Sequence, residues 1–153
     1  MKIIYHCFGG THSSVTAASA HLGRLSRDRS PSPRELLSLP FFDTREGNDH
    51  GDITLLGVDS MGNEVYFAGQ RGKPYILENV VNGLAQNFNL PADSYRLVNV
   101  MHKVNISMKI GGFLSRRFRW IKTGRPLVTL GTVWAYPEII KLVRNVLAEE
   151  SNG

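Results

Sequence analysis

The sequence contains a single cysteine, Cys7, which excludes an internal disulfide and any zinc site built from several cysteines. Long hydrophobic runs are also missing, because every uninterrupted apolar stretch falls far short of the ~20 residues that a membrane-spanning helix needs. Met1 leads directly into the strand-like stretch KIIYHCF without the layout of a signal peptide. These absences predict a cytoplasmic protein with no membrane partner.

Acidic residues are absent from one long segment. The chain carries a net charge of +5, and no Asp or Glu occurs between residues 96 and 137. The basic residues of this segment are Arg96, Lys103, Lys109, Arg116, Arg117, Arg119, Lys122 and Arg125. Such a run creates a positive potential that attracts phosphate-bearing partners, although a solvated helix face is a commoner reason for it.

The length of the chain limits its domain organisation. With 153 residues, of which 42% are hydrophobic, it can form one ordinary core but not two comfortable domains. We therefore expect a single domain over residues 1–150, followed by a disordered tail at 151–153. The polar stretch at 24–52 is expected to be a mobile loop or a lid over a site.

Hydrophobic periodicity predicts alternating strands and helices. Strands are expected at 2–8, 53–59, 64–69, 95–100 and 127–130, and helices at 13–22, 33–39, 73–88, 105–121 and 137–149. The turn SMGN joins two of the strands into an antiparallel hairpin, because Gly62 and Asn63 tolerate a positive φ. The fold class expected is α/β: a single-domain three-layer sandwich with a mostly parallel sheet of about five strands and one hairpin.

Three of these helices carry apolar faces at helical spacing. The helix at 73–88 has Ile76, Val80, Val81, Leu84 and Phe88, and the helix at 137–149 has Ile139, Ile140, Leu142, Val143, Val146 and Leu147. The helix at 105–121 is amphipathic and basic, and we expect it to break at Gly111 and Gly112 because glycine disfavours a helix interior.

The turn between the first strand and the first helix is the main candidate site. In an open α/β sheet, ligands bind at the carboxyl ends of the strands, where this turn lies. Glycines let its amides point inward, hydroxyls add donors, and the following helix presents free amides, so an anion-binding loop is expected. Its residues are Gly9, Gly10, Thr11, Ser13 and Ser14, with Arg116, Arg117 and Arg119 closing over the anion. The same residues also suit a plain turn with Ser13 or Ser14 as the helix cap.

The loop matches neither G-x-x-x-x-G-K-[ST] nor G-x-G-x-x-G. The stretch CFGGTHSS instead resembles the phosphate loop of the low-molecular-weight protein tyrosine phosphatases, since Cys7, Gly9 and Ser14 match and small alanines follow at 17 and 18. That resemblance implies phosphate binding. Ser13 stands where that family has the arginine that clamps the phosphoryl oxygens, and no late Asp-Pro supplies a general acid. The likeness thus supports phosphate binding better than phosphatase chemistry.

His12 and Cys7 are the candidate catalytic residues for a phosphoryl-transfer or hydrolytic step. An imidazole beside a thiol or a bound phosphate can act as a general acid or favour the thiolate. His6 alternates to the other side of its strand from Cys7, so His12 is the better candidate. A buried structural cysteine and a solvated loop histidine are the alternatives.

No metal site is predicted, and no cofactor is assigned. Five histidines could supply zinc ligands in principle, but no i, i+4 pair and no HExxH spacing occurs among them. They are His6, His12, His21, His50 and His102. An acidic loop containing Asp43, Asp49, His50 and Asp52 could bring a carboxylate or a magnesium-bound phosphate partner to the glycine turn, although such loops are more often solvated.

Two other functions stay open. The stretch RRFRWIK suits a nucleic-acid-binding module, because bases stack on aromatic rings such as Phe118 and Trp120 while arginines neutralise phosphates. A regulatory or scaffold protein with a purely structural glycine loop is the third hypothesis. The oligomeric state is not predicted.

A resemblance covers most of the chain. From its first twenty residues through SLPFFD and LGVDSMGNEVYFAG, the sequence resembles the bacterial domain of unknown function 3189 family. That resemblance implies a bacterial, cytosolic setting and no particular activity.

Overall fold

The computed structural model describes residues 1–44, 51–71, 73–102 and 124–151. Their strands are β1 (Lys2–Cys7), β2 (Ile53–Val58), β3 (Glu64–Gly69) and β4 (Tyr95–Asn99), and their helices are α1 (Ser13–His21), α2 (Pro33–Leu37), α3 (Pro74–Asn87), the short 3₁₀ helix η1 (Val100–His102) and α5 (Gly124–Ser151). The expected alternation of strands and helices is confirmed over most of the described chain.

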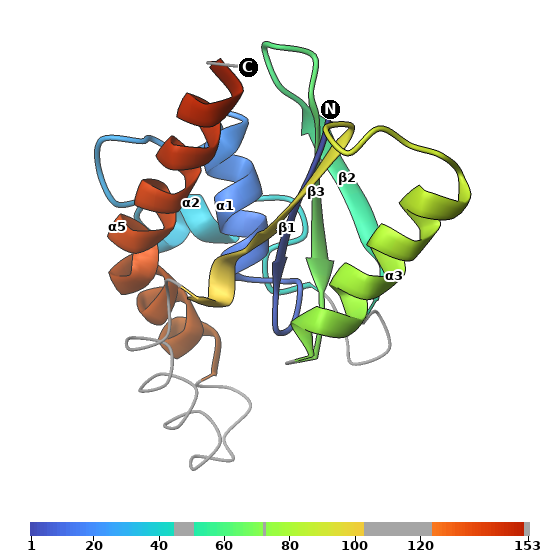
Figure 1. Cartoon of the computed structure of the whole chain (residues 1–153). Helices are drawn as coiled ribbons and strands as arrows, with labels where there is room; N and C mark the ends of the chain where they lie inside the picture. Colours follow the sequence, from blue (N-terminus) through green and yellow to red (C-terminus); the bar gives the residue numbers. More distant parts are fainter. Residues whose placement is uncertain (45–50, 72, 103–123, 152–153) are drawn as a thin grey trace.

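One sheet with the strand order β2-β3-β1-β4 forms the centre of the molecule (Figure 1). β1 pairs in parallel with both β3 and β4, whereas β2 pairs antiparallel with β3 as the predicted hairpin. Helices cover both faces, so the α/β class, the mostly parallel sheet and the single hairpin are confirmed. β1 is central in the sheet, so both of its faces are covered and every one of its residues after Lys2 is buried.

The larger core lies between the sheet and α1, α2 and α5 (Figure 1). Every residue of α1 is buried, and its alanines allow α5 to approach closely. The apolar face predicted for the end of α5 is confirmed, since Ile139, Ile140, Val143 and Val146 are buried. Thus α1 is held between the sheet and α5, and its first turn lies at the end of β1.

The opposite face of the sheet is covered by α3 alone among the described helices (Figure 1). Its buried residues are Leu77 and Ala85. The face predicted for this helix is largely wrong, because most of its members are exposed: Ile76, Val80, Leu84 and Phe88. Helical spacing identified the helix but not the side that packs on the sheet.

The expected strand at 127–130 is wrong, because these residues belong to α5. The sheet of the described chain therefore has four strands and not about five. A short apolar run fits a buried strand and a buried helical segment equally well. Pro137 marked the expected start of the last helix, but it lies inside α5, where it removes one amide donor from the helix.

α2 is a short helix with a complete capping box. Ser32 accepts a hydrogen bond from the Glu35 amide, and the Glu35 carboxylate accepts one from the Ser32 amide. The predicted helix at 105–121 lies outside the described residues. Within the described part of the chain, no helix combines the length and the apolar character that crossing a bilayer requires.

Candidate functional site

The loop that follows β1 is hydrogen-bonded to the loop that follows β3. The Gln70 amide donates to the Cys7 carbonyl at 2.9 Å. The Arg71 amide donates to the Phe8 carbonyl at the same distance of 2.9 Å. The two loops thus continue the parallel pairing of their strands beyond the sheet.

β1 and β3 are parallel neighbours, yet the helices that follow them lie on opposite faces of the sheet (Figure 1). α1 follows β1 and packs with α5, whereas α3 follows β3 on the other face. The carboxyl edge of these two strands is therefore a topological switch point. Open α/β sheets bind their ligands at such points.

Gly10 allows the two loops to touch. Its φ is +68°, and a Cβ at this position would lie 2.5 Å from the Gly69 amide nitrogen. A Cβ on Gly9 would meet only the Thr11 methyl group, at an ordinary 3.7 Å. The tight shape of the loop therefore depends on Gly10 and on the strand end that it contacts.

Cys7 is buried within the loop. It is 3% exposed, and its Sγ accepts a hydrogen bond from the Gly10 amide at 3.3 Å. The same sulfur donates to Ser14 Oγ at 3.2 Å, and Ser14 is itself fully buried. The thiol and the serine hydroxyl thus link the end of β1 to the start of α1.

α1 begins without a side-chain cap among the described residues. His12 occupies the cap position, and Ser13 and Ser14 lie inside the first turn. The expectation that either serine caps the helix is wrong. The helix begins at Ser13, so the cap position falls on His12 and both serines lie within the helix. The first turn brings backbone amides and a partial positive charge to the switch point.

His12 forms a pair with Asp43. The His12 Nε2 lies 3.0 Å from Asp43 Oδ1, and both side chains are about one quarter exposed or less. Burial lowers the pKa of His12, and the hydrogen bond to Asp43 acts in the opposite direction. The imidazole edge also packs against the Phe42 ring. A neutral histidine held by a carboxylate has the orientation that general acid–base chemistry requires.

The segment that carries Asp43 packs against the loop after β1. The Asp43 amide donates to the Thr11 carbonyl at 3.1 Å, and the Thr11 hydroxyl donates to the Phe41 carbonyl at 3.3 Å. Phe41 and Asp43 have positive φ values of 67° and 55°. Non-glycine residues rarely adopt this conformation, so contacts with the loop hold the segment in place.

Of the acidic residues expected near the loop, Asp43 is the one that the structure brings to it. Asp49 and His50 lie outside the described residues, and Asp52 is exposed next to β2. The expected role of this segment as a lid stays a prediction.

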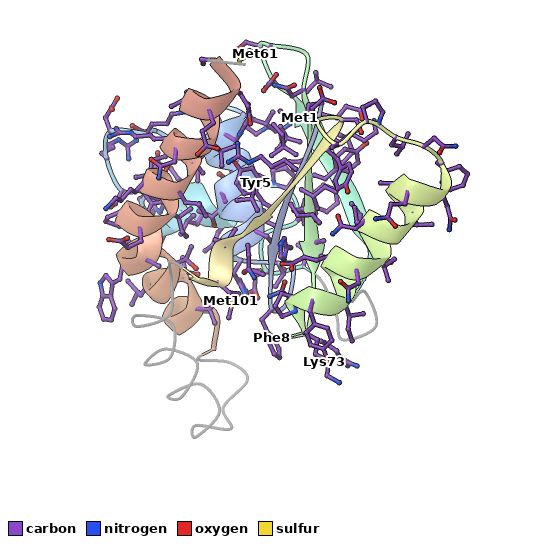
Figure 2. The ribbon with its side chains drawn as sticks, in the orientation of Figure 1. Met1, Tyr5, Phe8, Met61, Lys73 and Met101 are labelled. Atoms are coloured by element: carbon purple, nitrogen blue, oxygen red, sulfur yellow. The ribbon has the colours of Figure 1, made fainter. Side chains whose placement is uncertain are left out.

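Two basic residues that the sequence reasoning missed stand at the same edge. Arg71 and Lys73 are exposed and follow β3 directly. They line a cavity of about 300 Å³ together with Gly69, Gln70 and Leu77. Figure 2 labels Phe8 and Lys73 at this end of the sheet. The sequence signal was GQRGKP, a glycine and basic residues between a strand and a helix-starting proline.

The predicted anion-binding Arg116, Arg117 and Arg119 lie outside the described residues. The buried His6 hydrogen-bonds to Gln70, and its Nε2 is 4.0 Å from Glu78 Oε1. His21 has separate partners at the far end of the sheet. The histidines with described side chains therefore belong to three different environments.

The fold defines a mixed α/β protein, and its switch point at the carboxyl edge of β1 is the candidate site. The chain belongs to the DUF3189 family, described as a protein of unknown function, whose model matches residues 2–148. No curated protein and no solved structure matches the chain.

Proposed function

We propose that the protein binds a phosphate-bearing small ligand, of phosphate or nucleotide type, at the edge of the sheet where the loop after β1 and the loop after β3 meet. The observation that supports this proposal is the switch point itself. The first turn of α1, which has no side-chain cap among the described residues, follows the loop after β1. Arg71 and Lys73 belong to the loop after β3, which is hydrogen-bonded to the loop after β1 through the Gln70 and Arg71 amides. A helix start and basic side chains are the groups that recur in phosphate sites.

The groups at this edge would make different contacts with the ligand. The amides of Ser14 and Val15 in the first turn of α1 would donate to phosphate oxygens, and the helix dipole favours an anion there by about 0.3–1 kcal/mol. Arg71 and Lys73 would add charge-assisted hydrogen bonds of about 1.5–3 kcal/mol each. Gly10 shapes the loop rather than binding the anion, because its amide already donates to Cys7.

Any hydrolytic or phosphoryl-transfer step would rely on His12. With Nε2 turned to Asp43, its Nδ1 is the nitrogen left to accept or return a proton. The Cys7 thiol is hydrogen-bonded to the Gly10 amide and to the Ser14 hydroxyl, so the proposal gives it a structural role rather than a catalytic one. A His12→Gln variant that stays folded and binds ligand should then lose turnover, whereas Cys7→Ser should keep it.

Thermal unfolding tests the binding proposal. Inorganic phosphate and nucleotides at about ten times their Kd should raise Tm by about 3–6 °C, with chloride at equal ionic strength as the control. Lys73→Gln should weaken phosphate binding about tenfold, which corresponds to about 1.4 kcal/mol. Lys141→Gln, an exposed lysine on α5, is the matched control. The proposal is wrong if these anions leave Tm unchanged, or if both variants weaken binding equally.

A further inference from the structure

A second polar cluster lies at the other end of the sheet from the loop after β1. It consists of His21 at the end of α1, Asp59 directly after β2, and Glu150 near the end of α5. Figure 2 shows this end at Met61, which lies near the end of α5 and away from Phe8 and Lys73. The cluster is therefore separate from the proposed phosphate site.

The three side chains converge although all of them are removed from water. His21 Nε2 lies 3.1 Å from Asp59 Oδ2 and 3.9 Å from Glu150 Oε2. One ligand atom from each residue falls within 4.8 Å of the other two. The side chains are 0%, 5% and 1% exposed, respectively. Two carboxylates buried this closely are costly unless a positive charge balances them.

Nearby protein cations are engaged elsewhere. Arg96 pairs with Glu149, and Arg27 donates to the backbone carbonyls of Ala20 and His21. Among the described lysines and arginines, none lies within ion-pair distance of Asp59 or Glu150. The described chain thus provides two acidic ligands without a matching cation.

Glu150 supplies an independent indication of a ligand. Its side chain is 1% exposed and points toward His21, yet its Oε1 has no hydrogen-bond partner among the described residues. A buried carboxylate oxygen without a partner is rare, because it loses water and gains nothing in return. A cation bound by this carboxylate would remove that penalty.

A second layer of hydrogen bonds orients these ligand atoms. Tyr5 Oη lies 2.8 Å from His21 Nδ1, so the tyrosine oxygen can accept a hydrogen bond from Nδ1–H and leave Nε2 for a metal ion. Asp59 Oδ1 accepts hydrogen bonds from the amides of Met61 and Asn63, both at 2.8 Å, which fixes the carboxylate. Metal-bound histidines and carboxylates generally have such outer partners.

We propose that His21, Asp59 and Glu150 bind one divalent transition-metal ion such as Zn²⁺, Mn²⁺ or Co²⁺. One imidazole nitrogen and two carboxylates suit these ions, whereas Mg²⁺ and Ca²⁺ prefer oxygen ligands alone. Ligands 2.0–2.2 Å from one ion lie about 3–4 Å apart, which the His21 distances match. The ion would tie α1, the β2–β3 turn and the end of α5 together.

The test uses the tag-free full chain, stripped with EDTA and dialysed into phosphate-free buffer. Zn²⁺, Mn²⁺ or Co²⁺ at about 100 times its Kd should raise Tm by about 5–10 °C, while Mg²⁺ should not. Calorimetry should give one ion per chain. Bound Co²⁺ should show visible absorption that is absent from the metal-free protein. If none of the three ions binds or raises Tm, the proposal is wrong.

Matched variants place the ion. Glu150→Gln keeps the shape of the side chain but weakens it as a ligand, so metal affinity should fall at least tenfold. Glu138→Gln removes the same charge from an exposed residue of α5 away from the cluster and should leave affinity unchanged. Equal affinities in the two variants would put the ion elsewhere and overturn the proposal. Because wild-type titration needs no variant, a folding defect in Glu150→Gln does not weaken the test.

Discussion

At the scale of single residues, the loop after β1 depends on the missing side chain of Gly10. A Gly10→Ala variant would force a Cβ to 2.5 Å from the Gly69 amide nitrogen at a φ of +68°. We expect a loss of about 2–4 kcal/mol in the free energy of unfolding, from positive-φ strain and overpacking together. Urea unfolding measures this loss.

Gly23→Ala is the control for this substitution. Gly23 has a nearly identical φ of +70°, but a Cβ there meets nothing within 4 Å. Gly23→Ala should therefore lower the free energy of unfolding by only ~1 kcal/mol, the cost of the positive-φ strain alone. If both variants lose a similar amount of unfolding free energy, the contact between the two loops does not contribute to stability.

His12 should make stability depend on pH. Burial lowers its pKa in the folded state, so the unfolded chain binds the proton more readily. Stability from this residue is complete above its ordinary pKa of about 6.5 and is lost as pH falls below that value. The stability advantage of wild type over His12→Gln should therefore shrink between pH 8 and pH 5 in urea unfolding. A gap that stays constant or widens on acidification would contradict this account.

At the scale of elements, α2 is too short to be stable alone and depends on its cap. Ser32→Ala removes the hydrogen bond to the Glu35 amide and should cost about 1 kcal/mol of unfolding free energy. Ser30→Ala changes an exposed serine before the helix and should cost less than about 0.5 kcal/mol. Equal costs in chemical denaturation would mean that the capping box does not support the helix.

α5 contributes through its buried face. Ile139 is fully buried in the main core, so Ile139→Ala should cost about 2–5 kcal/mol. Leu130 on the same helix is 42% exposed, and Leu130→Ala should cost about 1 kcal/mol or less. Equal losses in guanidinium unfolding would contradict the packing of this helix.

Element types were predictable where local pattern decides them. β1, the hairpin and the end of α5 follow from alternation, turn residues and helical spacing. The 127–130 segment was not predictable, because four residues of which three are apolar do not distinguish a strand from a helix that continues in both directions. The buried face of α3 was predicted wrongly for another reason. Leu77 and Ala85 are buried because of how the helix lies on the sheet, and this depends on tertiary packing that the helical spacing does not contain.

At the scale of the whole molecule, the strand order decides which residues meet. The sequence predicted that the turn after β1 lies at the carboxyl edge of the sheet. It could not predict that β3 lies beside β1 and brings Arg71 and Lys73 to that edge. The cluster of His21, Asp59 and Glu150 likewise arises from three distant elements, so no spacing in the sequence reveals it.

The most direct test of the central claim is a phosphate titration of the ¹⁵N-labelled protein followed by NMR. The account predicts saturable shifts, with one common Kd, of the Ser14, Val15 and Arg71 amides. Amides at the far end of the sheet, such as that of Met61, should not move. If the first-turn amides do not respond to phosphate, or if the shifts centre on another surface, the switch point is not an anion site.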